Sequence, residues 1–129
     1  MTTTVTSITD FACGDALELD HTITGLPAQI TSCELGLRAS RATTTNLVTR
    51  TITTSSSASG QIINAGTVQT DGTYTAEVAF LLTGGAEGDT VTYFTPGVTT
   101  WGYCTAYVST APYTAEVLAI TPDVGGKYG

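Results

Sequence analysis

Apolar and polar residues alternate along several stretches of this chain. In residues 17–23 (LELDHTI) the odd positions are apolar or histidine, and in residues 31–37 (TSCELGL) most odd positions are again apolar. In residues 74–80 (YTAEVAF) the even positions carry the larger apolar side chains. Because neighbouring side chains of a β-strand point to opposite faces, this alternation predicts strands with one buried and one exposed face.

The third stretch gives the sharpest expectation about side-chain orientation. Tyr74, Val78 and Phe80 share one face of the expected strand, and Thr75 and Glu77 share the other. We expect the first three side chains in the core and the other two at the surface.

Turn residues divide the chain into short segments. Gly-Leu-Pro, Asp-Gly, Gly-Gly and Pro-Gly sequences separate runs rich in Thr, Val, Ile and Tyr, which favour strands. No segment has a clear helical period. Many short strands predict an all-β fold, a single antiparallel immunoglobulin-like β-sandwich of about 8–9 short strands. We expect these strands near residues 4–9, 15–24, 29–38, 47–54, 61–69, 73–83, 89–95, 100–109 and 113–120.

The length of 129 residues suits one β-sandwich domain, residues 1–129. We place its core at about residues 14–120 and interpret residues 1–10 and 121–129 as interaction arms outside the basic sandwich. An extended arm of low charge can add a strand to the edge of a neighbouring sheet. The candidate partner-interface residues are therefore Thr2, Thr3, Thr4, Val5 and Thr6.

The charge of the chain excludes two classes of partner. Only 12% of residues are charged, the formal net charge is −7 and the isoelectric point is about 4.2. Nucleic acids and anionic membranes both attract basic surfaces, so we expect neither as a partner. Residues 1–10 lack the basic and apolar regions of a secretory signal, and no apolar run is long enough to cross a membrane.

The three cysteines, Cys13, Cys33 and Cys104, lie far apart in the sequence. Zinc sites usually contain closely spaced pairs, and a disulfide framework needs an even number. We interpret the three as buried thiols of a protein made in a reducing cytoplasm. One disulfide with one remaining thiol is the alternative.

Candidate catalytic groups are few. His21 is the only histidine and continues the apolar face of its strand, and no Gly-x-Ser-x-Gly sequence supplies a nucleophile. Glu18 and Asp20 share one strand face, where acidic side chains usually contact solvent. Residues 84–88 (GGAEG) lack the Lys-Ser/Thr that ends a phosphate loop. We therefore predict a protein that is not an enzyme and uses no cofactor.

Acidic turns suggest calcium, and aromatic strand residues suggest sugars. The acids Asp71, Glu87, Asp89 and Asp123 lie in expected turns without the spacing of an EF-hand, so we interpret them as solvated and predict no metal site. Trp101, Tyr103 and Tyr107 share one strand face and, with Tyr113, could stack on sugars. Aromatic sets of this kind usually belong to the core of a sandwich, and we interpret them in that way.

Lysine is almost absent from the chain, which has Lys127 alone, whereas threonine is its commonest residue. Lysine normally prevents the edges of sheets from pairing with other chains. A surface rich in threonine costs little to desolvate and suits lasting contact with other proteins. This composition favours a component of an assembly, with a secreted, protease-resistant surface module as the alternative.

Several short motifs, in order along the chain, resemble those of a known family. Gly14-Asp15 precedes an alternating strand, and residues 23–26 (ITGL) and 35–38 (LGLR) follow. Later motifs are residues 70–78 (TDGTYTAEV), 89–90 (DT) and 102–103 (GY). Across about residues 14–110 the chain resembles immunoglobulin-like modules of tailed bacteriophages and is similar to the N-terminal domain of phage baseplate upper proteins. Residues 71–74 also resemble the tyrosine corner of immunoglobulin-type sandwiches.

This resemblance implies a non-enzymatic virion structural protein, either a capsid decoration protein or a small tail, neck or baseplate component. Such a protein is made in the host cytoplasm, resides in the virion and binds other virion structural proteins as a homo-oligomer or as part of a lattice. A β-sandwich adhesion or glycan-binding module for host surfaces is the alternative. A small hydrolase is the third and least favoured hypothesis.

Overall fold

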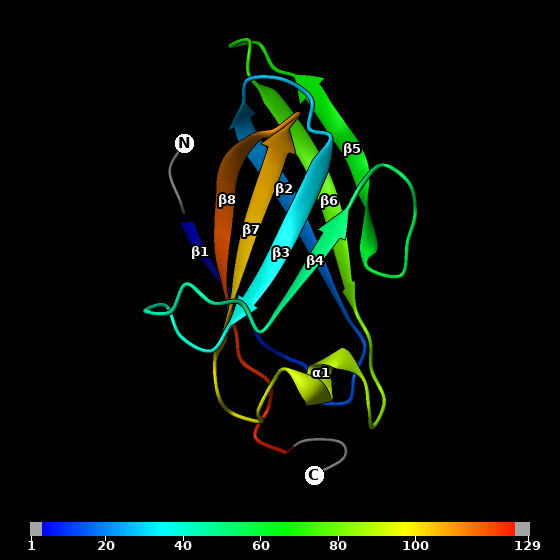
Figure 1. The fold of residues 1–129 in the computed structure, drawn as a ribbon, viewed down its shortest axis with the longest axis vertical. Helices are drawn as coiled ribbons and strands as arrows, with labels where there is room; N and C mark the ends of the chain where they lie inside the picture. The colour runs from blue at the N-terminus through cyan, green and yellow to red at the C-terminus, as the bar shows by residue number, and fades with distance from the viewer. Residues whose placement is uncertain (1–3, 126–129) are drawn as a thin grey trace.

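The protein is a sandwich of two β-sheets (Figure 1). The computed structural model describes residues 4–125, without the side chains of residues 4–6 and 114–116. In this part of the chain a five-stranded sheet has the order β1-β8-β7-β3-β4, and a three-stranded sheet has the order β2-β6-β5. The strands are β1 (Thr4–Ile8), β2 (Leu17–Leu26), β3 (Ser32–Arg38), β4 (Val48–Ile52), β5 (Gly60–Val68), β6 (Tyr74–Leu82), β7 (Thr100–Val108) and β8 (Ala111–Ile120).

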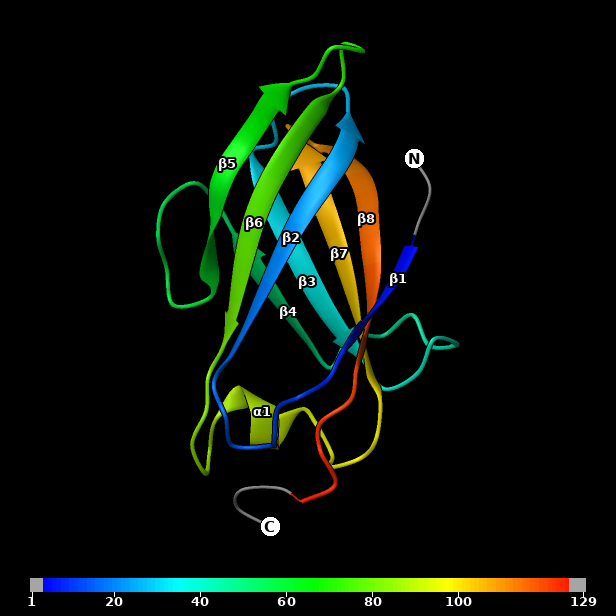
Figure 2. The same ribbon diagram turned by 180° about the vertical axis from the view of Figure 1, so that it is seen from behind.

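The strand order confirms the expected fold class. Sheet neighbours β8, β7 and β3 correspond to strands G, F and C of an immunoglobulin-type sandwich, and β2, β6 and β5 correspond to B, E and D. All pairs are antiparallel except β1 and β8, which run parallel. Figure 2 shows the molecule from behind, with the three-stranded sheet in front.

The core lies between the two sheets and follows the alternation of the sequence. In β2 the buried side chains up to Ile23 are odd-numbered, including His21, which is 8% exposed. A register shift between Ile23 and Leu26 then turns the even-numbered Leu26 into the core. In β6, Val78 and Phe80 are buried, Tyr74 packs against the core and Glu77 is exposed. The predicted orientation is therefore confirmed for these positions, whereas Thr75 is half-buried.

The strand expected near residues 89–95 is wrong, because this segment contains the short helix α1 (Asp89–Thr92). Polar side chains hold it at one end of the sandwich. The hydroxyl of Thr90 donates to the Asp15 carbonyl at 2.7 Å and accepts from the Gly14 N–H at 2.9 Å. These tertiary contacts override the strand preference of the sequence DTVTY, which local propensity alone could not show.

The tyrosine corner expected at residues 71–74 is also wrong. Residues 69–73 form a hairpin turn between β5 and β6, closed by a 2.7 Å hydrogen bond from Gln69 N to Thr73 O. Both strands belong to the three-stranded sheet. A tyrosine corner instead lies where the chain crosses from one sheet to the other.

The N-terminal arm is partly a strand of the sandwich itself. Thr4–Ile8 forms β1, which pairs with β8 in a register that places Val5 opposite Val117. The expectation that residues 1–10 lie outside the sandwich is therefore wrong for this strand. Among the candidate interface residues, Thr4, Val5 and Thr6 lie in β1, and Thr2 and Thr3 lie outside the described residues.

The C-terminal segment also contacts the sandwich along part of its length. The N–H of Thr121 donates to the carbonyl of Ile8 at 2.9 Å, and the N–H of Asp123 donates to the carbonyl of Phe11 at 2.8 Å. The expected arm at residues 121–129 is therefore anchored at least as far as Asp123. Residues 126–129 lie outside the described part of the chain.

Candidate binding surface on the five-stranded sheet

The aromatic residues of β7 lie on the outer surface of the five-stranded sheet. Trp101, Tyr103 and Tyr107 are half-buried, whereas the alternate residues of β7 are buried in the core. The interpretation of these rings as core residues is therefore wrong. The buried alternate residues are Thr100, Gly102, Cys104 and Ala106.

Packing from neighbouring strands explains this arrangement. A Cβ atom added to Gly102 would lie 3.2 Å from Leu35 Cδ1, 3.3 Å from Ile120 Cδ1 and 3.3 Å from Leu118 Cβ. Leucine and isoleucine from β3 and β8 already fill the core beside β7 at this point, so only a small residue fits there. The alternation in the sequence correctly separated the two faces of β7. It did not show which of these faces points into the core.

Two arginines cover aromatic rings on this surface. The guanidinium carbon of Arg38 lies 4.1 Å from the centroid of the Tyr103 ring, and that of Arg41 lies 5.3 Å from the Trp101 ring. Both distances are within the range of cation–π contacts. Stacking of this kind orients a guanidinium group while leaving its edge available for hydrogen bonds.

Arg38 is held in place by polar contacts as well. Its Nε donates to Asn46 Oδ1 at 2.8 Å and its Nη1 donates to Thr43 O at 3.4 Å. Asn46 Nδ2 in turn donates to Thr49 Oγ1 at 2.9 Å. Asn46 also covers Gly36, where an added Cβ would lie 2.6 Å from the amide nitrogen. The glycine thus makes room for the residue that orients the arginine.

A second polar contact fixes the other end of the surface. The hydroxyl of Tyr107 donates to Glu34 Oε1 at 2.9 Å. This hydrogen bond raises the pKa of Tyr107, with smaller contributions from burial and from the Glu34 charge.

We call the outward-facing set of side chains on β7, on β3 and on the loop after β3 the aromatic face. It consists of Glu34, Arg38, Arg41, Trp101, Tyr103 and Tyr107.

The outer surface of the other sheet is acidic. Glu18 and Asp20 from β2 and Glu77 from β6 are exposed there, as the alternation predicted, and line a hollow of about 370 Å³. Repulsion from Asp20 is the main cause that raises the pKa of Glu18, followed by a hydrogen bond between the two side chains. Ile63, which is 60% exposed, also lines the hollow. We call Glu18, Asp20, Ile63 and Glu77 the acidic face.

The acids suggested for calcium do not come together. Asp71 accepts hydrogen bonds from the N–H and hydroxyl of Thr73, which lower its pKa. Glu87 and Asp123 are exposed, and Asp89 is buried. Among the side chains that the structure describes, no three from His, Cys, Asp or Glu are placed to hold a metal ion.

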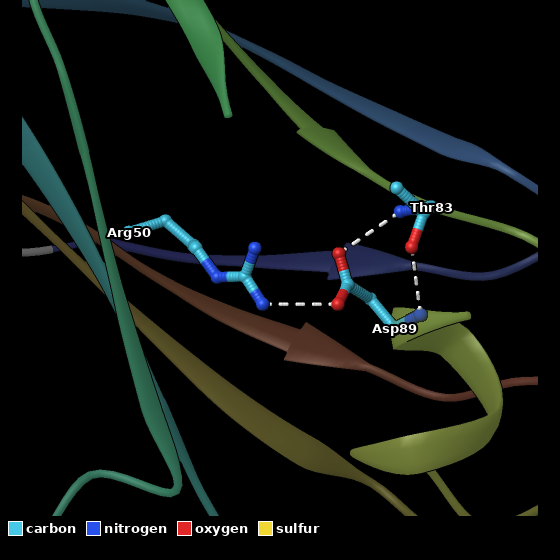
Figure 3. A network of polar contacts seen from close by, with 3 residues as sticks. All are labelled: Arg50, Thr83 and Asp89. Carbon is cyan, nitrogen blue, oxygen red and sulfur yellow. Dashed lines mark hydrogen bonds and ion pairs between the residues drawn. The ribbon is translucent and has the colours of Figure 1, made fainter. Parts of the chain in front are cut away.

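Asp89 instead belongs to an internal polar network (Figure 3). Its carboxylate accepts from Arg50 Nη2 on β4 and from the N–H of Thr83, each at 3.0 Å. The hydroxyl of Thr83 accepts from the N–H of Asp89 at 3.0 Å. The network therefore links α1 to both sheets. It also gives Arg50 a partner within the protein, so the position of this arginine does not require a ligand.

The cysteines are free and buried, in agreement with the first of the two alternatives above. Cys33 and Cys104 lie on neighbouring strands with their Sγ atoms 3.5 Å apart, and both are fully buried. Their mutual hydrogen bond, followed by burial, raises the pKa of Cys33, and burial raises that of Cys13. A raised pKa makes the thiols of Cys13 and Cys33 poor nucleophiles.

Comparison of the chain with protein-family models, curated proteins and solved structures found no match. Among the described residues, no helix is both long and apolar enough to cross a membrane.

Proposed function

We propose that this protein is a non-enzymatic structural component of a tailed-bacteriophage virion and that it binds neighbouring protein chains through the aromatic face. The observation that carries the proposal is the outward position of Trp101 and Tyr103 beneath Arg38 and Arg41. Residues of these three types dominate the binding energy of protein interfaces. Capsid decoration and small tail, neck or baseplate positions are the roles that the sequence resemblance favours.

The rigidity of the aromatic face supports binding to a protein. Arg38 is held by Asn46 and by the Tyr103 ring, and Tyr107 is held by Glu34. Side chains that are already ordered lose less conformational entropy when a partner binds. The face also lacks lysine, which is depleted from interface cores.

The edge of the five-stranded sheet offers a second contact for assembly. Within the described residues β1 pairs with β8 along one side only, so its other side is a free edge. A neighbouring strand could pair there through main-chain hydrogen bonds. The interface role proposed for Thr4, Val5 and Thr6 is thus compatible with their place in the sandwich.

Analysis of purified particles tests the proposal. We expect mass spectrometry of washed virions to detect the protein at a constant copy number. Replacing both Trp101 and Tyr103 by alanine should lower its occupancy on particles at least about tenfold, since truncating interface aromatics costs about 2 kcal/mol or more. Val68→Ala is the control, because Val68 is 59% exposed at the end of β5 on the other sheet. Absence from washed particles would overturn the proposal.

A glycan-binding module is the second candidate, because the same rings are outward-facing. Sugars stack on the faces of aromatic rings. In this protein Arg38 and Arg41 lie over two of those faces, which leaves less ring surface for a sugar. The arginines therefore favour a protein partner.

Replacing both arginines by glutamine separates these two candidates. Arg38→Gln with Arg41→Gln should weaken binding to particles about tenfold or more if the guanidinium groups contact a protein. The same variant uncovers the rings and should strengthen binding on a glycan array if sugars are the ligands. Stronger glycan binding with unchanged particle occupancy would favour the glycan-binding module instead.

A further inference from the structure

The two sheet surfaces have opposite charge. The aromatic face contains Arg38 and Arg41 and one acid, Glu34, whose carboxylate accepts a hydrogen bond from Tyr107. Arg50 is already paired with Asp89. On the opposite surface, the acidic face contains three exposed carboxylates. Because the two sheets pack with their inner sides together, the two faces lie on opposite sides of the molecule (Figures 1 and 2).

We propose that the aromatic face of one copy of this chain binds the acidic face of a second copy, so that copies associate head to tail. This inference rests on the proposed function, in that it names one of the neighbouring chains as the protein itself. Contact between two different surfaces leaves one of each unused at the ends. Further copies can therefore add to both ends.

The chemistry of the two faces is complementary. Guanidinium groups form strong, paired hydrogen bonds with carboxylates, and stacking on an aromatic ring holds them in place for this contact. In the described structure Arg38 uses Nε and Nη1 internally, and its Nη2 donates to no other residue. This nitrogen is available for Glu18, Asp20 or Glu77 of the second copy.

Shape and apolar area agree with the same pairing. The hollow of about 370 Å³ on the acidic face offers space for a side chain projecting from the aromatic face. Contact would also cover Ile63, one of the most exposed large apolar side chains. The raised pKa of Glu18 reflects repulsion from Asp20, which an arginine from another copy would relieve.

Charge also disfavours the symmetric alternatives. Pairing two acidic faces would bring six carboxylates together, because each copy contributes Glu18, Asp20 and Glu77. Pairing two aromatic faces would bring four guanidinium groups together with only two carboxylates, because each copy contributes Arg38, Arg41 and Glu34, and Glu34 already accepts a hydrogen bond from Tyr107. Like charges at an interface cost free energy, and each symmetric arrangement leaves an excess of one sign, whereas the head-to-tail arrangement brings the two arginines to three carboxylates.

Two complementary variants test the proposal by sedimentation velocity. The first variant, Arg38→Gln with Arg41→Gln, disables the aromatic face. The second, Glu18→Gln with Asp20→Asn and Glu77→Gln, disables the acidic face. We expect the wild-type protein to form dimers and larger oligomers with rising concentration, and each variant alone to dissociate at least about tenfold more readily. Glu87→Gln is the control, because it removes one exposed charge outside both faces.

Mixing the variants gives the decisive result. The intact acidic face of the first variant can bind the intact aromatic face of the second, and neither has another working face. The mixture should therefore form dimers with one copy of each variant and no larger species. Circular dichroism of each variant verifies that it is folded.

A wild-type protein that stays monomeric up to about 1 mM, where even weak association is detectable, would overturn the inference. A mixture of variants that stays monomeric while the wild type associates would also overturn it, since another surface would then be responsible. The occupancy of the protein on particles shows whether such a result contradicts only the head-to-tail association or also the proposed structural role. A monomeric protein that is still present on washed virions refutes head-to-tail association and leaves the structural role in place.

Discussion

Replacing Phe80 by alanine is expected to lower the free energy of unfolding by about 3–5 kcal/mol, the usual cost of removing a buried aromatic ring. Phe80 is fully buried on β6, the central strand of the three-stranded sheet, and faces the other sheet. Equilibrium unfolding in urea measures this change. The loss of unfolding free energy has two parts, the transfer free energy of the removed ring atoms and the cost of the cavity that they leave.

Thr75→Ala is the control for this experiment. Thr75 lies on the same strand, but it is half-buried near the start of β6. A change of about half a kcal/mol or less is expected there. Losses of equal size at Thr75 and Phe80 would contradict the packing described for β6.

Replacing Asp89 by alanine is expected to cost about 2–3 kcal/mol of unfolding free energy, because it leaves Arg50 and the N–H of Thr83 without their carboxylate partner. The Arg50 side chain is 28% exposed, so water compensates part of the loss and the upper values for fully buried pairs are not expected. Thermal and urea unfolding measure the effect. Figure 3 shows the three residues concerned.

Glu87→Ala is the matched control for Asp89, because Glu87 is exposed in the same connection between β6 and β7. Its effect should stay within about half a kcal/mol. The double variant of Arg50 and Asp89 to alanine should lose less than the sum of the single losses, by about 0.5–3 kcal/mol. Additive losses would mean that the ion pair does not contribute to stability.

Much of the fold could be predicted because alternation reports burial directly. The pattern of residues 17–23 correctly placed Leu19, His21 and Ile23 inside. Alternation failed for residues 89–95, where the hydroxyl of Thr90 and the carboxylate of Asp89 form tertiary hydrogen bonds that fix a helical turn. Contacts between distant segments leave no periodic signal in the local sequence.

The candidate binding surface was only half predictable. The sequence identified Trp101, Tyr103 and Tyr107 as one set, yet their size suggested the core. Which side of β7 faces inward depends on Leu35 and the other large residues packed beside Gly102. That information comes from β3 and β8, which are distant in sequence from this glycine or separated from it by a turn. The cation–π contacts of Arg38 and Arg41 likewise needed the three-dimensional arrangement.

The parallel pairing of β1 and β8 determines how the sandwich bears mechanical load. Thr4 at the start of β1 is opposite Glu116, and Ile8 at its end is opposite Ile120, the last residue of β8. A force that pulls residues 4 and 120 apart along the strands therefore slides β1 past β8. All hydrogen bonds of the pair then resist together, whereas a hairpin pulled open at its ends breaks its bonds in succession. A chain held at these two points would therefore load the β1–β8 pair in shear, with the five registered residue pairs from Thr4–Glu116 to Ile8–Ile120 sharing the force.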